Sequence, residues 1–268
     1  MIRGMFSAAS GMQATTKKMD VISNNLSNSA TTGFKASRAE FKDIFSAIVR
    51  APGVQNADGT VSPVGIQIGH GVMLSSVAHD FAQGSPIQAS TDPKDVTVMI
   101  SGQGFFKIQL PDGQTGYTRD GTFHLDKTGQ IVTADGYPVV GPTSIPSNAS
   151  VVSINQNGTV SYTDPSAPPQ NAIVPAGHFV LARFPNPQGL FAVGNNMFKE
   201  SDASGTAISD NPDNDGMGFL RQHYQEASNV DLVGEMVDMI ITQRSYEIGS
   251  KAISTADEML SVVKDLKR

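Results

Sequence analysis

Cysteine and tryptophan are absent from the chain of 268 residues, and basic residues are sparse. Without cysteine, neither a disulfide framework nor a thiolate metal site is possible. Nineteen basic residues stand against twenty-five acidic ones, which gives a net charge of −6. Outside the extreme C-terminus, lysine and arginine cluster at most in pairs. Because nucleic-acid binding needs a basic surface, nucleic acid is not an expected partner.

Long hydrophobic runs are also missing. No apolar run approaches the roughly 18 residues that a membrane-spanning helix requires, so we do not expect a membrane-embedded protein. Residues 1–12, MIRGMFSAASGM, are too polar for the core of a signal peptide. If the protein leaves the cytoplasm, we expect export by another route, without a cleaved signal peptide.

The sequence lacks the motifs of the common enzyme classes. It contains no HxH or HExxH spacing, no GxSxG elbow and no Walker loop, so neither catalytic nor cofactor-binding residues are expected. A β-rich hydrolase would need paired carboxylates in a cleft, whereas Asp112, Asp120 and Asp135 stand at Asx-Gly turns instead. The histidines are far apart in sequence: His70, His79, His124, His178 and His223.

One segment imitates a calcium loop. In residues 211–216, NPDNDG, the side chains of Asn211, Asp213 and Asp215 occupy positions one, three and five, and Gly216 occupies position six. Position twelve would be Gln222, so the bidentate carboxylate of such a loop is missing. Clusters of Asp, Asn and Gly are also ordinary turn chemistry, and we expect a plain loop without a metal.

The N-terminal residues have a helical pattern. Apolar and small residues recur in steps of three and four, which predicts one seam of an amphipathic helix within residues 1–30. So narrow a stripe needs a second helix to pack against. The predicted seam comprises Ile2, Met5, Ala9, Met12, Thr16, Met19, Ser23 and Leu26.

A second helical pattern occupies residues 229–268 and is the predicted partner. Ser228 and Asp231 stand at capping-box spacing, and Glu235 favours the helix start through the macrodipole. The methionines in both helices are expected to fill space between helices. The seam residues expected here are Met236, Ile240, Ile248, Ala252, Met259 and Val262.

Between the helical ends, the pattern changes to alternation and short apolar runs. Asp112-Gly113, Asp120-Gly121, Asp135-Gly136 and Asn157-Gly158 punctuate these runs, and Asx-Gly pairs favour hairpin turns. The fold class is therefore α+β, with long terminal helices pairing as a coiled-coil-like domain around a central antiparallel β-rich domain. The expected divisions are 1–30 (helix), 31–90 (extended connection), 91–215 (β domain), 216–228 (return connection) and 229–268 (helix).

This arrangement indicates an assembly subunit. Helices at opposite ends of a sequence, with seams of small residues and methionine, suit repeated packing between copies in an open helical filament. A coiled-coil dimer fits the same pattern.

Three segments together resemble the flagellar rod and hook protein family. NNLSNSATTGFK, residues 24–35, is similar to the N-terminal signature of that family. Residues 101–141 resemble its shared β domain, and residues 229–260 resemble its C-terminal helix. The signature residues are Asn24, Asn25, Leu26, Asn28, Gly33, Phe34 and Lys35.

Within that family, residues 49–71 resemble the connecting insertion of the distal rod. A proximal rod or hook subunit is the alternative within the family, and a secreted adhesin or effector is an alternative outside it. An adhesin would share the turn-rich β domain but would not need matched helices at both termini.

The resemblance implies a structural role. Its members build a rigid hollow tube with paired terminal helices inside and β domains outside, which transmits motor torque to the hook and encloses the export channel. The implied partners are further copies of this chain, proximal rod proteins, the hook protein, the surrounding ring proteins and the flagellar export apparatus. The implied location is the periplasm-spanning rod of the basal body.

The asparagines of the signature have two interpretations. Asn24, Asn25 and Asn28 could form a polar recognition patch, or they could end the helix and start a turn. We favour the structural interpretation. In it, Thr32-Gly33-Phe34 redirects the chain, and Phe34 and Phe41 anchor it in the core on the β side.

Overall fold

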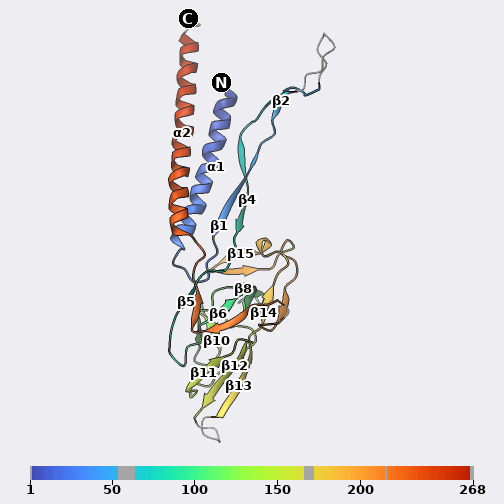
Figure 1. Cartoon of the computed structure of the whole chain (residues 1–268), viewed down its shortest axis with the longest axis vertical. Coiled ribbons are helices and arrows are strands. Elements are labelled where there is room, and N and C mark those ends of the chain that lie inside the picture. The colour runs from blue at the N-terminus through green and yellow to red at the C-terminus, as the bar shows by residue number, and fades with distance from the viewer. Residues whose placement is uncertain (1, 54–63, 166–171, 215, 266–268) are drawn as a thin grey trace. The chain divides into compact units, whose positions relative to one another are not determined.

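The computed structural model describes residues 2–53, 64–165, 172–214 and 216–265. The fold is mixed α+β, with a helix near each end of the chain and strands between them (Figure 1). The chain forms two compact units. The helical unit comprises Met1–Ser27, Ser37–His79 and Asp231–Arg268, and the β unit comprises Asn28–Ala36 and Asp80–Val230.

These units group the residues differently from the ranges expected above. The expected connection 31–90 is divided between the units, because residues 37–79 belong to the helical unit and residues 31–36 and 80–90 to the β unit. Residues 216–230 also belong to the β unit. The reason is strand pairing over long sequence separations, which local composition does not reveal.

Two antiparallel helices form the helical unit. Helix α1 spans Ile2–Ser27 and α2 spans Leu232–Asp265. Met12 lies against Gly249, and the ammonium of Lys18 lies 3.9 Å from the carboxylate of Asp238. Residue numbers therefore rise along one helix as they fall along the other, and Figure 1 shows the two helices side by side.

A strand ribbon accompanies α1 in the same unit. Strand β1 (Ser37–Asp43) pairs antiparallel with β4 (Val72–His79), and both contact α1. Beyond them, β2 (Ala47–Arg50) pairs with β3 (Ile66–Ile68). The sequence pattern had indicated an extended connection here, so the hairpin is a correction. Both runs contain β-branched residues, which favour strands: Ile48 and Val49 in the first, Ile66 and Ile68 in the second.

Strands in several small sheets build the β unit. The largest sheet has the order β15-β16-β8-β7-β14-β17, and a three-stranded sheet has the order β11-β12-β13. Strand pairs β10–β9, β18–β6 and β19–β5 complete the described pairings. The bounds are β5 Pro86–Gln88, β6 Val98–Ser101, β7 Phe105–Gln109, β8 Thr115–Thr118, β9 Phe123–Leu125, β10 Ile131–Thr133, β11 Val151–Ile154, β12 Thr159–Asp164, β13 Ala172–His178, β14 Leu181–Arg183, β15 Phe191–Gly194, β16 Met197–Lys199, β17 Ile208–Asp210, β18 Phe219–Gln222 and β19 Tyr224–Glu226, with a 3-10 turn at Pro187–Gly189.

Aromatic side chains organise the core of the β unit. Phe106 is fully buried, and its ring meets the rings of Phe123 and Phe179 edge-on at 5.0 and 5.9 Å. Such pairs add roughly 0.5–1.5 kcal/mol each beyond the burial of their area. A second cluster on the other side of the main sheet contains Phe105, Phe184 and others. The β unit therefore has a hydrophobic core of its own.

The Asx-Gly pairs have different outcomes. Asp112-Gly113 joins the paired strands β7 and β8, and Asn157-Gly158 joins β11 and β12, as expected of hairpin turns. Asp135-Gly136 lies in a turn closed by a hydrogen bond from the Thr133 N–H to the Tyr137 carbonyl. The prediction was wrong for Asp120-Gly121, because β8 pairs with β7 and β16 while β9 pairs with β10.

Candidate functional site

Asn25 lies at the centre of the polar contacts in the helical unit. Its side-chain amide donates hydrogen bonds to the Ser37 carbonyl and to the Glu235 carboxylate, both at 2.8 Å. Its side-chain oxygen accepts a hydrogen bond from the Ser37 N–H at 2.9 Å. The side chain is buried at 1% exposure, and all its polar capacity is directed at protein groups. Asn25 thus ties together α1, the start of β1 and the first turn of α2.

The least exposed side chains of α2 lie on the face toward α1. They follow a step of three and four residues along the helix, as expected for one face packed on a neighbour. Thr242 and Ala256 are buried, and a Cβ added at Gly249 would stand 2.8 Å from Cγ of Met12. The set comprises Glu235, Met239, Thr242, Gly249, Ile253, Ala256 and Leu260.

The predicted seam of α2 lies on other faces of the helix. Ile248 is 67% exposed, so in the single chain it does not pack on α1. The difference arises because residues 232–241 are apolar on several faces, so periodicity alone does not select the face that meets α1. The exposed predicted residues are Met236, Ile240, Ile248, Ala252, Met259 and Val262.

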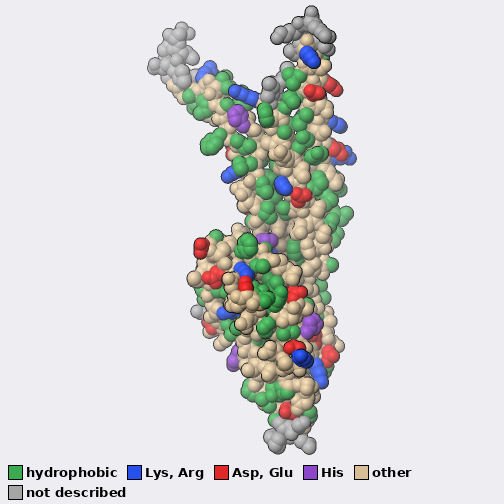
Figure 2. Space-filling model, turned by 180° about the vertical axis from the view of Figure 1, so that it is seen from behind, with side chains coloured by type: hydrophobic (Ala, Val, Ile, Leu, Met, Phe, Trp, Pro, Cys, Tyr) green, Lys and Arg blue, Asp and Glu red, His purple; other side chains and the backbone are tan. Residues whose placement is uncertain are grey.

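Exposed apolar residues of α2 recur along one outer face of the helix, with the exposed Arg244, Lys251 and Thr255 between them. We define the outer stripe as Val233, Val237, Ile240, Ile248, Met259 and Val262, which are 47–69% exposed. At 100° per residue, it lies opposite the face that packs on α1. Figure 2 shows many hydrophobic side chains on the visible surface of the helical unit. A helix that is apolar on two opposite faces is suited to burial between two partners.

The predicted seam of α1 is partly buried. Met5, Met12, Met19 and Leu26 are intermediate in exposure, and the side chain of Ile2 lies outside the described residues. The most deeply buried residues of α1 are instead Ala14, Ile22 and Asn25. Because α1 packs on β1 and β4 as well as on α2, its buried surface is wider than a single seam.

The start of α2 differs from the capping pattern expected in the sequence. The helix begins at Leu232, directly after Asp231, whose carbonyl accepts the Glu235 N–H. Ser228 lies outside the helix, and its hydroxyl accepts the Val230 N–H at 3.4 Å. The predicted cap at Ser228 is therefore wrong. The stretch before the helix is held by strand pairing of β19 and by Asn229 instead.

The β unit holds the rest of the signature, in a segment that we call the signature loop (Asn28–Ala36). Gly33 has a φ of +68°, and its N–H donates to the Glu226 carbonyl at 2.8 Å. A Cβ at this position would stand 2.8 Å from the backbone nitrogen of Asp120. Glycine is therefore required both by the left-handed backbone and by the close approach of another chain segment.

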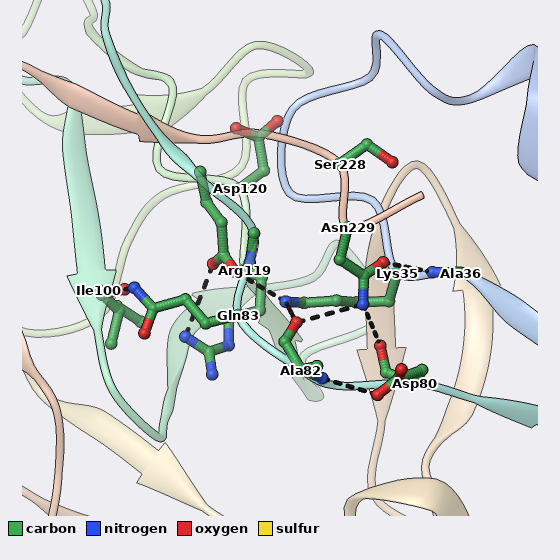
Figure 3. Close-up of polar contacts among 12 residues, drawn as sticks. Lys35, Ala36, Asp80, Ala82, Gln83, Ile100, Arg119, Asp120, Ser228 and Asn229 are labelled. Carbon is green, nitrogen blue, oxygen red and sulfur yellow. Dashed lines mark hydrogen bonds and ion pairs between the residues drawn. The ribbon is translucent and has the colours of Figure 1, made fainter. Parts of the chain in front are cut away.

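Lys35 is the best-anchored side chain of the signature loop. Its ammonium donates hydrogen bonds at 2.7 Å to the Glu226 carboxylate and to the Ala82 carbonyl. Asn229 supports the same stretch, because its side-chain oxygen accepts the Ala36 N–H and its amide donates to the Asp80 and Ala82 carbonyls. Figure 3 shows Lys35, Ala82 and Asn229 converging at this point.

Arg119 completes a buried charge cluster with Lys35 and Glu226. Its guanidinium Nη1 lies 3.6 Å from Oε2 of Glu226, and the three side chains are 0–4% exposed. Burial lowers the pKa of both Lys35 and Arg119, and the charge of Glu226 opposes that effect. Of the three, the sequence motifs singled out Lys35 alone, because the members of the cluster lie far apart in the chain.

The other signature residues are less constrained. Asn28 contacts Thr31, and Phe34 is half-buried in the β unit. Phe41 is 37% exposed on β1 of the helical unit. The expectation that Phe41 anchors the β-side core is therefore wrong, because the chain enters the helical unit at residue 37. Asn24 is exposed and Leu26 half-buried.

Metal sites and membrane spans were sought among the residues that the structure describes. Within the described ranges, no group of three or more His, Asp or Glu side chains is placed to hold a metal ion. In the same ranges, neither helix combines the length and hydropathy of a membrane span. Asp215 of the calcium-like loop lies outside the described residues, and Asp213 there has a φ of +65°.

Comparison with known proteins identifies three matching family models in chain order. Residues 5–35 match "Flagella basal body rod protein", and residues 99–162 match "Flagellar hook protein FlgE/F/G D1 domain". Residues 221–266 match "Flagellar basal body rod FlgEFG protein C-terminal". The first match covers the signature loop up to Lys35, the second contains Arg119, and the third contains Glu226.

Curated relatives match over the whole length. The flagellar basal-body rod protein FlgG of Borreliella burgdorferi is 43% identical over 270 residues, covering 100% of both chains. FlgG of Caulobacter vibrioides is 43% identical and covers 99% of this chain and 100% of its own. FlgG of Bacillus subtilis is 40% identical over 275 residues and 100% of both chains. These matches confirm the resemblance that the three sequence segments indicated.

Proposed function

The chain belongs to the flagellar basal-body rod protein family and is a structural rod subunit, and on that premise we propose that it builds the distal rod by polymerising through its helices. The relatives named above are rod proteins over their full lengths, which supports a rod role for the whole chain. The finer parts of the proposal concern the packing of copies, the neighbours of the rod and its mechanical role.

The observation that carries the proposal is the two-sided character of α2. One face packs on α1, whereas the outer stripe leaves Val233 and Ile248 69% and 67% exposed. Burying an aliphatic side chain of this size contributes roughly 1.5–3 kcal/mol. A stripe of six such residues is large for a monomeric surface and supports an interface between copies.

The partner of the stripe is a helix of a second copy. A stripe on α2 meeting another face of the neighbouring helices is a head-to-tail contact, which continues into an open filament when it does not close into a ring. The paired helices then form a coiled-coil-like inner wall. The β unit has a hydrophobic core of its own, so its folding does not need that wall.

The β2–β3 hairpin supports a distal rod subunit over a hook subunit. Phe45 is 94% exposed, and Ile48, Val49 and Val64 are 60–70% exposed. An isolated two-stranded hairpin is marginal in water, so these side chains need cover. In the proposal, neighbouring copies supply it, and the resulting contacts resist sliding and make the tube stiff.

The wider role follows from the family. A stiff hollow tube would transmit motor torque to the hook and enclose the export channel. Its neighbours would be proximal rod proteins, the hook protein and the surrounding ring proteins, and the flagellar export apparatus would deliver the subunits. The location would be the part of the basal body that crosses the periplasm.

Polymerisation of the purified protein tests the proposal. At high concentration, electron micrographs are expected to show tubes, and Ile248→Asp or Met259→Asp is expected to prevent them while leaving the β unit folded. A carboxylate in the stripe would be buried without a partner on assembly. The matched control is Ser250→Asp on the polar flank of the same helix, which should still polymerise. Tubes of Ile248→Asp with normal yield would refute the role of the stripe.

A further inference from the structure

Three charged side chains from distant parts of the sequence meet in the interior of the β unit. Lys35 comes from the signature loop, Arg119 follows β8, and Glu226 ends β19. Their side chains are 0%, 4% and 1% exposed, respectively. The proposed function does not use this cluster, and surface packing does not explain it.

Glu226 is the one acidic member and contacts all the others. Its Oε1 accepts hydrogen bonds from the Lys35 ammonium at 2.7 Å and from the Gly84 N–H at 2.9 Å. Its Oε2 lies 3.6 Å from Nη1 of Arg119 and, among the described residues, accepts no hydrogen bond. One carboxylate therefore balances two cations.

Arg119 is held in place without Lys35. Its Nη2 donates to the Gly102 carbonyl at 2.9 Å, and its guanidinium lies 5.4 Å from the ring centre of Phe105. Within the described residues, its Nε and Nη1 have no hydrogen-bond partner. Arg119 thus belongs to the fixed wall that the signature loop meets.

The carboxylate of Glu226 offsets only one of the two buried positive charges. With Glu226 present, the buried cluster carries a net charge of about +1, and the next carboxylate acting on Lys35 is that of the exposed Asp80. Without the charge of Glu226, docking of Lys35 would bury two cations together. Removing one partner from a buried ion pair is strongly unfavourable because it leaves an uncompensated charge.

We propose that Glu226 acts as an interlock, so that the signature loop docks on the β unit only when the β19 strand is already in place. Lys35 is then buried against the β unit only after Arg119 and Glu226 are both in place. A chain with β19 unpaired or missing leaves its signature loop undocked. The interlock makes docking of an N-terminal segment depend on a residue 191 positions further along the chain.

Backbone contacts reinforce this dependence. The Gly33 N–H donates to the carbonyl of Glu226, and the Ala36 N–H donates to the side chain of Asn229. Both acceptors belong to the same C-terminal stretch as β19. Pairing of β19 with β5 therefore presents the carboxylate, one carbonyl and the Asn229 side chain together.

Hydrogen exchange of the full chain, followed by mass spectrometry, tests the interlock. The variants are Glu226→Gln, Lys35→Met and the double variant Lys35→Met/Glu226→Gln. In Glu226→Gln, exchange of residues 29–35 should accelerate by about tenfold or more while the strands β7 and β8 stay protected. Lys35→Met should accelerate this exchange less, because Glu226 still forms its ion pair with Arg119 and its hydrogen bond with the Gly84 N–H.

The double variant decides between an interlock and independent contacts. Removing Lys35 from Glu226→Gln removes the surplus cation, so the double variant should be no less protected than Glu226→Gln alone. Additive or greater loss in the double variant would overturn the proposal, as would parent-like protection in Glu226→Gln. If Glu226→Gln does not fold, recovery of strand protection in the double variant supports the interlock, and failure to recover overturns it. Lys199→Met, which breaks the partly exposed ion pair with Asp112, is the control and should leave residues 29–35 unchanged.

Discussion

The side-chain amide of Asn25 donates a hydrogen bond of 2.8 Å to the carboxylate of Glu235, a residue 210 positions away in the sequence. Through this contact, the end of α1 is fixed to the first turn of α2. The same amide binds the carbonyl of Ser37, so one buried side chain joins α1 both to α2 and to β1.

Asn25→Asp is expected to loosen the helix pair by about 2 kcal/mol or more, because the donor is lost and two carboxylates face each other. The measurement is thermal unfolding followed by the helical circular dichroism signal. Asn25→Asp/Glu235→Gln is the matched rescue, since a glutamine amide can donate to the carboxylate introduced on α1 and so replace the lost donor. If the rescue melts no higher than Asn25→Asp, the contact does not hold the helices together.

Gly33→Ala is expected to destabilise the signature loop more than the same change at Gly113. Both glycines have positive φ values, +68° and +78°, so the backbone strain is similar. A Cβ at Gly33 would stand 2.8 Å from the nitrogen of Asp120, whereas a Cβ at Gly113 would meet nothing within 4 Å. The difference in melting temperature therefore measures the close approach alone. Equal melting temperatures of the two variants would show that the signature loop accommodates the added Cβ without a loss of stability.

The sequence predicted the elements of the fold better than their partners. Terminal helices and the turns at Gly113 and Gly158 follow from local patterns of periodicity and turn chemistry. The face of α2 toward α1 did not follow, because its first ten residues are apolar on several sides. Local pattern also could not show that residues 37–79 accompany the helices, since that depends on pairing of β1 with β4.

The candidate site was predicted by residue but not by contact. The signature contained Asn25, Gly33 and Lys35, yet nothing in the sequence paired Asn25 with Glu235 or Gly33 with Asp120, and Glu226 had no signal of its own. A buried charge looks like any surface charge in a sequence until its partners are placed. A lysine in a segment otherwise rich in Asn, Ser and Thr was the one available hint.

Deleting residues 55–64 is expected to leave subunits folded and able to polymerise, while the filaments bend more readily. Residues 55–63 of this segment lie outside the described residues. The exposed side chains of β2 and β3 flank it, and the proposal assigns their cover to neighbouring copies. Persistence length in electron micrographs is the measurement. Equal stiffness of the variant and parent filaments would mean that the segment has no mechanical role. Failure of the variant to assemble would mean that the segment is part of the tube wall.

Removing divalent cations is expected to leave the melting temperature unchanged. The loop of residues 211–216 lacks the bidentate carboxylate of a calcium loop, because position twelve is Gln222. A ligand that binds the native state raises stability in proportion to the logarithm of its concentration over Kd. Calorimetry in chelator and in millimolar calcium compares the two states directly. A rise in melting temperature with calcium would mean that the loop binds metal.

Thiol accessibility at one residue of the outer stripe tests the central claim most directly. The chain contains no cysteine, so Ile248→Cys introduces a single reactive thiol, and Ala256→Cys provides a matched thiol on the face toward α1. Ile248→Cys should react quickly in the monomer and at least about tenfold more slowly in the polymer, whereas Ala256→Cys should react slowly in both. If Ile248→Cys reacts in the polymer at its monomer rate, the stripe is not an interface between copies.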